Sequence, residues 1–440
     1  MTKRARNLAV NLALAAASVL VTLAALELLA PWILVRLPLK LHFALDRYQR
    51  PLAQSSKQGA VPREGYVVLL GDSYAMGLGD WLLDADADTN PPFHSAHVLH
   101  DLLGRDVLSL GRSGDSNLRA FVKRPFQALT YLASTRFAPP TPALFIAYFY
   151  EGNDLEDNLL DLAGAAPGYD PARLRDPGEF ERLLEREFVE VGRPWRTRPS
   201  LNDRPIITRV IRKTLSHAIF GWPAGFEPHR IAPADTNRAI VGGREVALPE
   251  PLQSASVGLD EERLELALYA SDQSLRYLRD HMPEVPVLLV FVPAPITTYA
   301  ISSAQVSVNG PGESELRVSR ATVAARSDHV CAHLERTAAA LGAGFLDVRR
   351  ELWPIARERF LHGPRDWAHF NRDGYTALAG AIAPVVSSRP PPVRPCERVA
   401  DYFEAADRLA AAVRASGAEA TGAARPGGRS DRATVMVDGH

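Results

Sequence analysis

The sequence predicts an α/β fold in which a parallel β-sheet is covered by helices on both faces. Short apolar segments, rich in β-branched and aromatic residues, recur along the chain and suit buried strands. Stretches with apolar residues at helical spacing lie between them, and strands that alternate with helices favour a parallel sheet. The longest of these helices is expected over 314–341. The expected strands are 67–70, 107–110, 143–150, 285–292 and 345–348.

Residues 1–36 predict a cytoplasmic basic end followed by a transmembrane anchor. Lys3, Arg4 and Arg6 precede a run from Leu8 to Leu26 that is almost wholly apolar. A run of about 20 such residues can span a bilayer as a helix, and basic residues before it place the amino terminus in the cytoplasm. We therefore expect a single-pass protein of a bacterial inner membrane, with the rest of the chain in the periplasm. A cleaved signal peptide is the alternative, although no short apolar core ends in a small-x-small site.

Composition excludes some classes of function. The chain has 440 residues, with 50 basic and 51 acidic side chains, so it lacks the basic excess typical of nucleic-acid-binding proteins. Two cysteines, Cys331 and Cys396, are too few for a zinc framework. They could form one disulfide in an oxidising compartment, but the sequence does not show that they meet.

The regions of the chain differ in composition. Residues 37–64, rich in proline and polar side chains, predict a linker, either a tether or a packed lead-in segment. Strands and helices alternate over 65–160 and 259–390, which we expect to form the catalytic domain. Proline, glycine and arginine interrupt that pattern over 161–258, which is interpreted as an insertion. Residues 391–440 predict a C-terminal helix and a disordered tail.

The first expected strand leads directly into Gly71-Asp72-Ser73. Gly71 permits a sharp exit because glycine adopts backbone angles closed to other residues. Ser73 then lies at the carboxyl end of a central strand, where open α/β sheets bind their ligands. A serine there is a candidate nucleophile if a base accompanies it. An ordinary strand-to-loop turn is the alternative interpretation of this tripeptide.

His369 and Asp366 supply a candidate base and its orienting group. Asp366 can hold one ring nitrogen of His369 and leave the other to take the Ser73 proton. An ordinary surface histidine is the alternative. Seven other histidines lack a comparable neighbourhood: His94, His97, His100, His281, His329, His333 and His362.

Candidate donors for a developing oxyanion follow two other strands. Gly111 and Gly114 can present unhindered backbone N–H groups, and Asn153 can present a side-chain amide. Each is also a common turn residue, so their joint order along the chain is the informative signal.

These blocks, in this order, resemble the SGNH/GDSL hydrolase family, here as a membrane-anchored bacterial member. The resemblance covers roughly 65–160 and 262–388, and it departs at Tyr74, where many members have leucine, and in the length of the insertion. It implies Ser73 as nucleophile, His369 as base and Asp366 as orienter. It also implies an oxyanion hole of Asn153 with Gly114, or with Gly111 as second choice. The blocks are Gly71-Asp72-Ser73, Ser109-Leu110-Gly111-Arg112-Ser113-Gly114-Asp115-Ser116, Gly152-Asn153-Asp154 and Asp366-Trp367-Ala368-His369.

The resemblance implies a three-layer α/β/α, flavodoxin-like SGNH hydrolase fold and a serine esterase. The enzyme is expected to cleave an acyl or acetyl ester, possibly of a glycan or a lipid, through an acyl-serine intermediate in the periplasm. No metal or organic cofactor is implied. One alternative is an O-acetyltransferase that modifies an exported polysaccharide and takes its acyl group from a membrane partner. Another is a non-catalytic glycan-binding scaffold.

Overall fold

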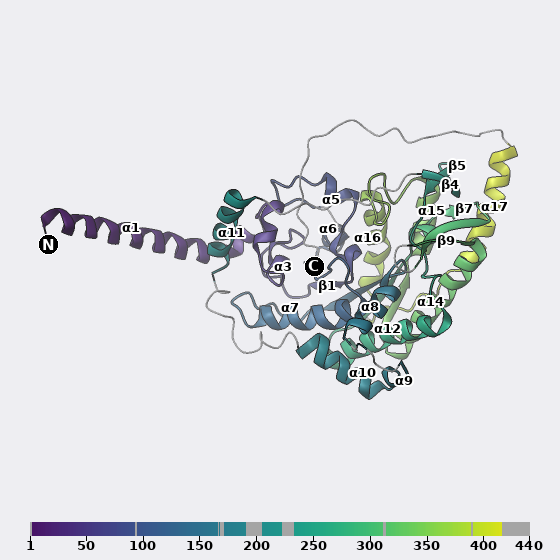
Figure 1. The fold of residues 1–440 in the computed structure, drawn as a ribbon, viewed down its shortest axis with the longest axis horizontal. Helices are drawn as coiled ribbons and strands as arrows, with labels where there is room; N and C mark the ends of the chain where they lie inside the picture. The colour runs from purple at the N-terminus through teal and green to yellow at the C-terminus, as the bar shows by residue number, and fades with distance from the viewer. Residues whose placement is uncertain are drawn as a thin grey trace.

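A computed structural model shows a mixed α/β body from which one long helix, α1 (Lys3–Leu28), projects (Figure 1). The structure describes residues 2–92, 95–165, 167, 171–190, 205–221, 233–310, 314–388 and 390–415. Parts of the predicted insertion and the predicted disordered tail lie outside the described residues.

The centre of the body is a sheet of five parallel strands. Each lies within two residues of its predicted bounds, so the predicted parallel sheet is confirmed. The register pairs Leu70, the last residue of β1, with Ala147, so β3 continues three residues past the end of β1 towards the same edge of the sheet. In spatial order the strands are β2 (Val107–Ser109), β1 (Val67–Leu70), β3 (Leu144–Tyr150), β6 (Val287–Val292) and β10 (Gly344–Asp347).

Helices pack against both faces of the sheet. Strand side chains alternate between two hydrophobic cores: Val67 and Leu69 belong to one, Val68 and Leu70 to the other. Because both cores are covered by helices, every residue of β1 is buried. The first core is covered by α6 (Ser95–Leu103), α15 (Arg349–Glu358) and α16 (Arg372–Val386). The second is covered by α7 (Arg124–Ala133), α12 (Glu261–His281) and most of α14 (Arg320–Ala340).

The segment 37–64, predicted as a linker, is packed against the body. Leu39, Phe43 and Leu52 are buried in the hydrophobic cores. Gln54 pairs with the backbone of Ser109 in β2, donating to its carbonyl at 2.7 Å and accepting from its N–H at 2.9 Å. Of the two interpretations of this segment, the packed lead-in describes the structure. Its elements are η1 (Leu39–Ala44) and α3 (Arg50–Ala53), after the short α2 (Ala30–Leu34).

The predicted insertion 161–258 holds more regular structure than its composition indicated. Its strands β4 (Pro233–Val241) and β5 (Arg244–Pro249) form a second, antiparallel sheet with β7 (Ala300–Ile301) of the main body. Its helical elements are the end of α8 (Asp154–Ala165), α9 (Pro171–Leu174), α10 (Pro177–Leu183), η3 (Leu184–Val189) and α11 (Ile206–Phe220).

The predicted helix 314–341 starts six residues too early. Residues Ser314–Ser319 form β9, which pairs with β8 (Gln305–Gly310) as a hairpin. The alternation of polar and apolar side chains in β9 has the period of a strand, and Ser319 then caps α14 by accepting from the N–H of Thr322 at 3.0 Å. The remaining elements are α4 (Ser73–Met76), α5 (Asp80–Asp84), η2 (Leu118–Lys123), α13 (Pro295–Thr298) and α17 (Val399–Ala415).

Helix α1 is long and apolar enough to cross a membrane, and none of its residues is buried. Its last turn meets the body through Glu27, whose carboxylate accepts from the N–H groups of Ile206 (3.0 Å) and Thr208 (2.8 Å) at the start of α11. This contact explains the acidic residue that interrupts the apolar run: it caps a second helix beside the end of the first.

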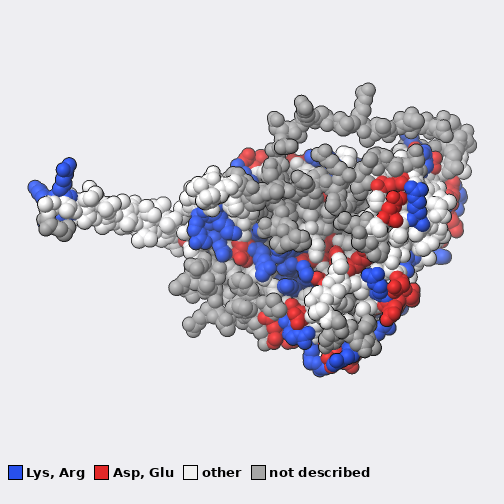
Figure 2. Space-filling view, in the orientation of Figure 1, with Lys and Arg blue, Asp and Glu red and all other residues white. Residues whose placement is uncertain are grey.

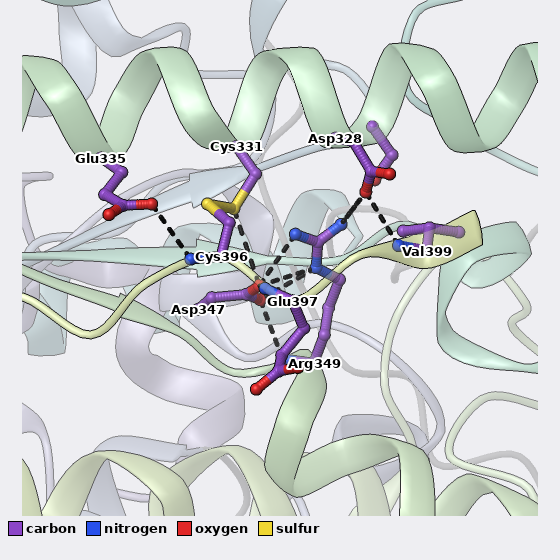
Figure 3. The surroundings of a disulfide bond; sticks show 9 residues. Asp328, Cys331, Glu335, Asp347, Arg349, Cys396, Glu397 and Val399 are labelled. Atoms are coloured by element: carbon purple, nitrogen blue, oxygen red, sulfur yellow. Dashed lines mark hydrogen bonds and ion pairs between the residues drawn. A yellow bond between two sulfur atoms is a disulfide. The ribbon is translucent and has the colours of Figure 1, made fainter. Parts of the chain in front are cut away.

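Cys331 of α14 and Cys396 form a disulfide (Figure 3). The bond fixes the segment that leads into α17 beside β10, the edge strand with which Val393 forms a parallel bridge at Phe345. Three backbone N–H groups of that segment also donate to carboxylates, so the segment is held along its length. These bonds run from Cys396 to Glu335 (3.0 Å), from Glu397 to Asp347 (2.8 Å) and from Val399 to Asp328 (2.8 Å).

We predict that removing this disulfide destabilises the protein. The cross-link joins residues 65 positions apart. Closing a loop of that length lowers the conformational entropy of the unfolded chain and raises its free energy by up to about 4 kcal/mol. The double variant Cys331→Ser, Cys396→Ser should therefore unfold at lower urea concentration than the oxidised protein. The reduced wild-type protein should have the same urea midpoint as the variant, and adding reductant should not change the midpoint of the variant. Equal urea midpoints for the oxidised protein and the variant would contradict the prediction.

Candidate active site

Ser73 is placed by a sharp turn at the end of β1. Gly71 has φ +146°, and a Cβ there would lie 3.0 Å from the side chains of both Ala75 and Tyr148, so the turn requires glycine. Asp72 then caps α4, its Oδ1 accepting from the N–H of Tyr74 at 2.9 Å. Ser73 is the first residue of α4 and is nearly buried at this edge of the sheet.

Ser73, His369 and Asp366 form one chain of hydrogen bonds. His369 Nε2 lies 2.9 Å from Ser73 Oγ, and His369 Nδ1 lies 2.8 Å from Asp366 Oδ2. An ionised Asp366 only accepts, so Nδ1 carries the proton and Nε2 presents a lone pair to the serine hydroxyl. The side chain of Asp366 is 1% exposed and that of His369 15%, so the ring can reach a ligand while its partner is shielded from water.

Asp80 holds the loop that carries Asp366, and sequence analysis did not identify it. Its carboxylate, on α5, accepts from the N–H groups of Arg365 (3.1 Å) and Asp366 (2.8 Å). Burial raises the pKa of Asp80, and these two N–H donors act in the opposite direction. Its partners are 285 and 286 positions away in the chain, so no local spacing marked it.

Tyr74, where the sequence departs from the family pattern, links the serine helix to the histidine loop. Its hydroxyl donates to the carbonyl of Ala368 at 2.8 Å, and its ring stacks on Tyr150 with centroids 4.0 Å apart. Burial raises the pKa of Tyr74 well above its usual value, so the phenol remains a neutral donor. Leucine at this position could not make the hydrogen bond.

The candidate oxyanion donors lie at the same edge of the sheet. Asn153 follows β3, beside the end of β1. Gly111 packs its α-carbon against α4, where a Cβ would lie 2.5 Å from Ala75, and its N–H donates to Ser109 Oγ at 3.3 Å. Gly114 is exposed, and within the described residues no acceptor is recorded for its N–H. Gly114 is therefore better suited than Gly111 to donate to a ligand. Within the described chain, neither Gly114 nor Asn153 bonds Ser73 directly.

The carboxyl groups of Asp72, Asp154 and Asp157 lie near one another; the first two residues are buried and Asp157 is half-buried. Burial raises the pKa of each, and the charge of Asp72 further raises the pKa values of Asp154 and Asp157. The pKa of Asp157 rises to about 7. Asp72 Oδ2 also lies 3.1 Å from Ser73 Oγ, so its protonation state bears directly on the serine hydroxyl.

Another histidine near the site, His362, is unsuited to act as a base. Burial lowers its pKa to about 3, and its Nδ1 lies 3.0 Å from the hydroxyl of Tyr299. His94, another of the histidines considered, lies outside the described residues.

Two groups of described side chains could hold a metal ion, and neither includes a residue of this site. One contains Cys331 and Cys396, which are bonded to each other and so offer no thiolate ligands. The other, of Glu261, Glu265 and His329, lies largely exposed on the surface.

Comparisons with known proteins place the chain far from characterised ones. No protein-family model and no curated protein sequence matches it. Among solved structures it is similar to a catalytic mutant of Axe2, an acetylxylan esterase from Geobacillus stearothermophilus, and to another Axe2 mutant described as an acetyl-xylooligosaccharide esterase. Both have 10% identity and a TM-score of 0.32; they cover 74% and 76% of this chain, and 96% and 99% of their own. Any functional assignment therefore depends on the geometry of the site.

We predict that Asp157→Asn stabilises the protein at alkaline pH. Below about pH 3 the carboxyl is protonated in both folded and unfolded states. As pH rises towards 7 only the unfolded state loses the proton, so wild-type stability falls through that range. The amide cannot ionise, and the variant should gain about 3 kcal/mol over wild type at pH 8 relative to their difference at pH 4. Urea unfolding at both pH values measures this.

The control is Asp280→Asn, an exposed carboxyl at the end of α12. It should not change the pH dependence. An Asp157→Asn curve parallel to wild type from pH 4 to pH 8 would contradict the prediction.

Proposed function

We propose that the protein is a serine esterase of the SGNH/GDSL hydrolase type, which cleaves an acyl or acetyl ester through an acyl-serine intermediate. The observation that carries the proposal is the continuous chain of hydrogen bonds from Asp366 through His369 to Ser73. The order of the sheet strands, 2-1-3-4-5 when counted along the chain, supports a flavodoxin-like fold. Such folds bind ligands beyond the carboxyl ends of their strands, where Ser73 and Asn153 lie.

In the first step Ser73 Oγ attacks the ester carbonyl carbon while its proton passes to His369 Nε2. Asp366 stabilises the imidazolium through Nδ1. The Gly114 N–H and the Asn153 amide donate to the tetrahedral oxyanion. The bond to the alcohol oxygen then breaks, and His369 protonates the departing alcohol. In the second step His369 takes a proton from water, which attacks the acyl carbon. The bond to Ser73 Oγ then breaks, His369 returns the proton to Oγ, and the acid is released.

The serine hydroxyl has two acceptors within reach before reaction: His369 Nε2 at 2.9 Å and Asp72 Oδ2 at 3.1 Å. One proton serves only one acceptor at a time. Burial raises the pKa of Asp72, and the N–H of Tyr74, the charge of His369 and the hydroxyl of Ser73 act in the opposite direction. We propose that the serine proton passes to His369, the base.

A sugar hydroxyl in place of water would make the same site an O-acetyltransferase. No feature of the described residues favours that acceptor, so hydrolysis is the function proposed.

We predict that Ser73→Ala lowers kcat for p-nitrophenyl acetate by roughly 10³-fold or more, because no other group can carry the acyl intermediate. His369→Gln should cause a similar loss, since it removes the base. Initial rates measure both, with circular dichroism to verify folding. Ser388→Ala, an exposed serine after α16, should leave the rate unchanged. Folded Ser73→Ala protein with wild-type turnover would refute a serine mechanism.

We propose that α1 anchors the protein in a bacterial inner membrane with the catalytic body in the periplasm. The basic amino terminus before α1 favours this orientation, and the Cys331–Cys396 disulfide suits an oxidising compartment. Helix α11, joined to α1 through Glu27, leaves Leu215, Ile219 and Phe220 exposed by 59%, 74% and 83%. A bilayer surface beside α1 would cover these side chains.

This location predicts that a photo-crosslinking amino acid at position 219 captures lipid in the full-length protein in anionic nanodiscs. Position 160 is the matched control, because Leu160 on α8 is similarly exposed, by 69%. Mass spectrometry should find lipid adducts at 219 and at most a trace at 160. Equal capture at both positions would contradict membrane contact by α11.

A further inference from the structure

A cavity beside the serine helix is lined by four arginines from three parts of the chain. Arg47 and Arg50 come from the lead-in segment, Arg112 from the loop after β2, and Arg124 from α7. The cavity has a volume of about 140 Å³, well above the roughly 15 Å³ that one water needs. Figure 2 shows Lys and Arg side chains gathered on the face over α3 in Figure 1.

Two of these arginines, Arg47 and Arg112, have no carboxylate partner among the described residues. Among the described residues, the lining of the cavity includes no aspartate or glutamate. Arg124 is paired with Asp115 through two hydrogen bonds of 2.5 Å. Within the described chain no carboxylate pairs with Arg112 or with Arg47, which lies over the ring of Tyr48 at 5.0 Å.

The arginines are close enough to repel one another. Burial lowers the pKa of Arg112, and the charges of Arg124, Arg47 and Arg50 lower it further, against the opposite effect of Asp115. An arginine stays ionised even so, and the repulsion therefore persists. A bound anion would relieve it, and guanidinium groups bind carboxylates and phosphates through paired hydrogen bonds.

The cavity adjoins the proposed nucleophile. Met76, which lines it, belongs to the same four-residue helix as Ser73. The backbone N–H of Arg112 donates to the carbonyl of Gly71 at 3.3 Å, so this loop is bonded to the turn that carries Ser73. Arg112 also stands two residues before Gly114, the proposed oxyanion donor. Ser73 and His369 do not line the cavity, so a substrate whose charged group binds here would have to extend past Met76 and Arg112 to reach the serine.

Resting on the esterase function proposed above, we propose that this cavity binds a negatively charged group of the ester substrate, a carboxylate or a phosphate. Leu39, Phe43 and Leu110 add an apolar wall, so the charged group is expected to be attached to an apolar or ring-shaped portion. The site thus selects anionic esters over neutral ones.

The test compares three acetate esters with one phenolic frame: 4-acetoxybenzoate, 4-acetoxyphenyl phosphate and the neutral methyl 4-acetoxybenzoate. Wild-type kcat/KM should favour at least one anionic ester by roughly tenfold or more over the neutral ester. The better of the two anions identifies a carboxylate-bearing or a phosphate-bearing substrate. Arg112→Gln should lower the anionic-to-neutral ratio about tenfold, and Arg112→Lys should lower it less because the charge remains.

Arg350→Gln is the matched control, because it removes an exposed arginine on α15 outside the cavity. It should leave the ratio unchanged. A wild-type ratio near one for both anions, or a ratio that Arg112→Gln does not alter, would overturn the proposal.

Calorimetry with benzoate and phenyl phosphate separates this inference from the esterase assignment. Ser73→Ala protein should bind at least one of the two anions, and adding Arg112→Gln should weaken that binding about tenfold. If none of the esters is hydrolysed but this binding pattern is found, the esterase assignment fails while the anion site stands. If the esters are hydrolysed but neither anion binds, the anion site fails.

Discussion

The hydrogen bond between His369 Nε2 and Ser73 Oγ is the contact on which the proposed chemistry depends. It joins residues 296 positions apart, from the end of the first sheet strand and from a loop after the last. A hydroxyl is a weak nucleophile without a base at this distance. The sheet provides the placement, because parallel strands bring their carboxyl ends to one edge.

Contacts outside the three reacting residues hold that geometry. Asp80 fixes the backbone of Arg365 and Asp366, and Tyr74 bonds Ala368, so the histidine loop is held from two sides. Gly79 permits the loop to pack closely, since a Cβ there would lie 2.4 Å from the carbonyl oxygen of Phe370. These groups act on orientation, and orientation determines whether a nucleophile and a base react.

The predictable parts of this protein were those with a local signal. Buried strands such as 67–70 appear as apolar runs, and the candidate triad follows motifs with short spacing, as in Asp366-Trp367-Ala368-His369. Asp80 could not be found in this way, because its partners are distant in the chain. The strand β9 at 314–319 gives a weak local signal, because its six residues lie directly before the long helix α14. The role of residues 37–64 depended on burial of Leu39 and Phe43, which composition does not reveal.

The most direct test of the central claim is the site of covalent labelling by a fluorophosphonate, a probe that reacts with activated serines. The full-length protein is labelled, digested and mapped by mass spectrometry. Our account predicts one label per molecule, on Ser73. A label on a different serine, or an unlabelled protein that is folded, would contradict the claim that His369 activates Ser73.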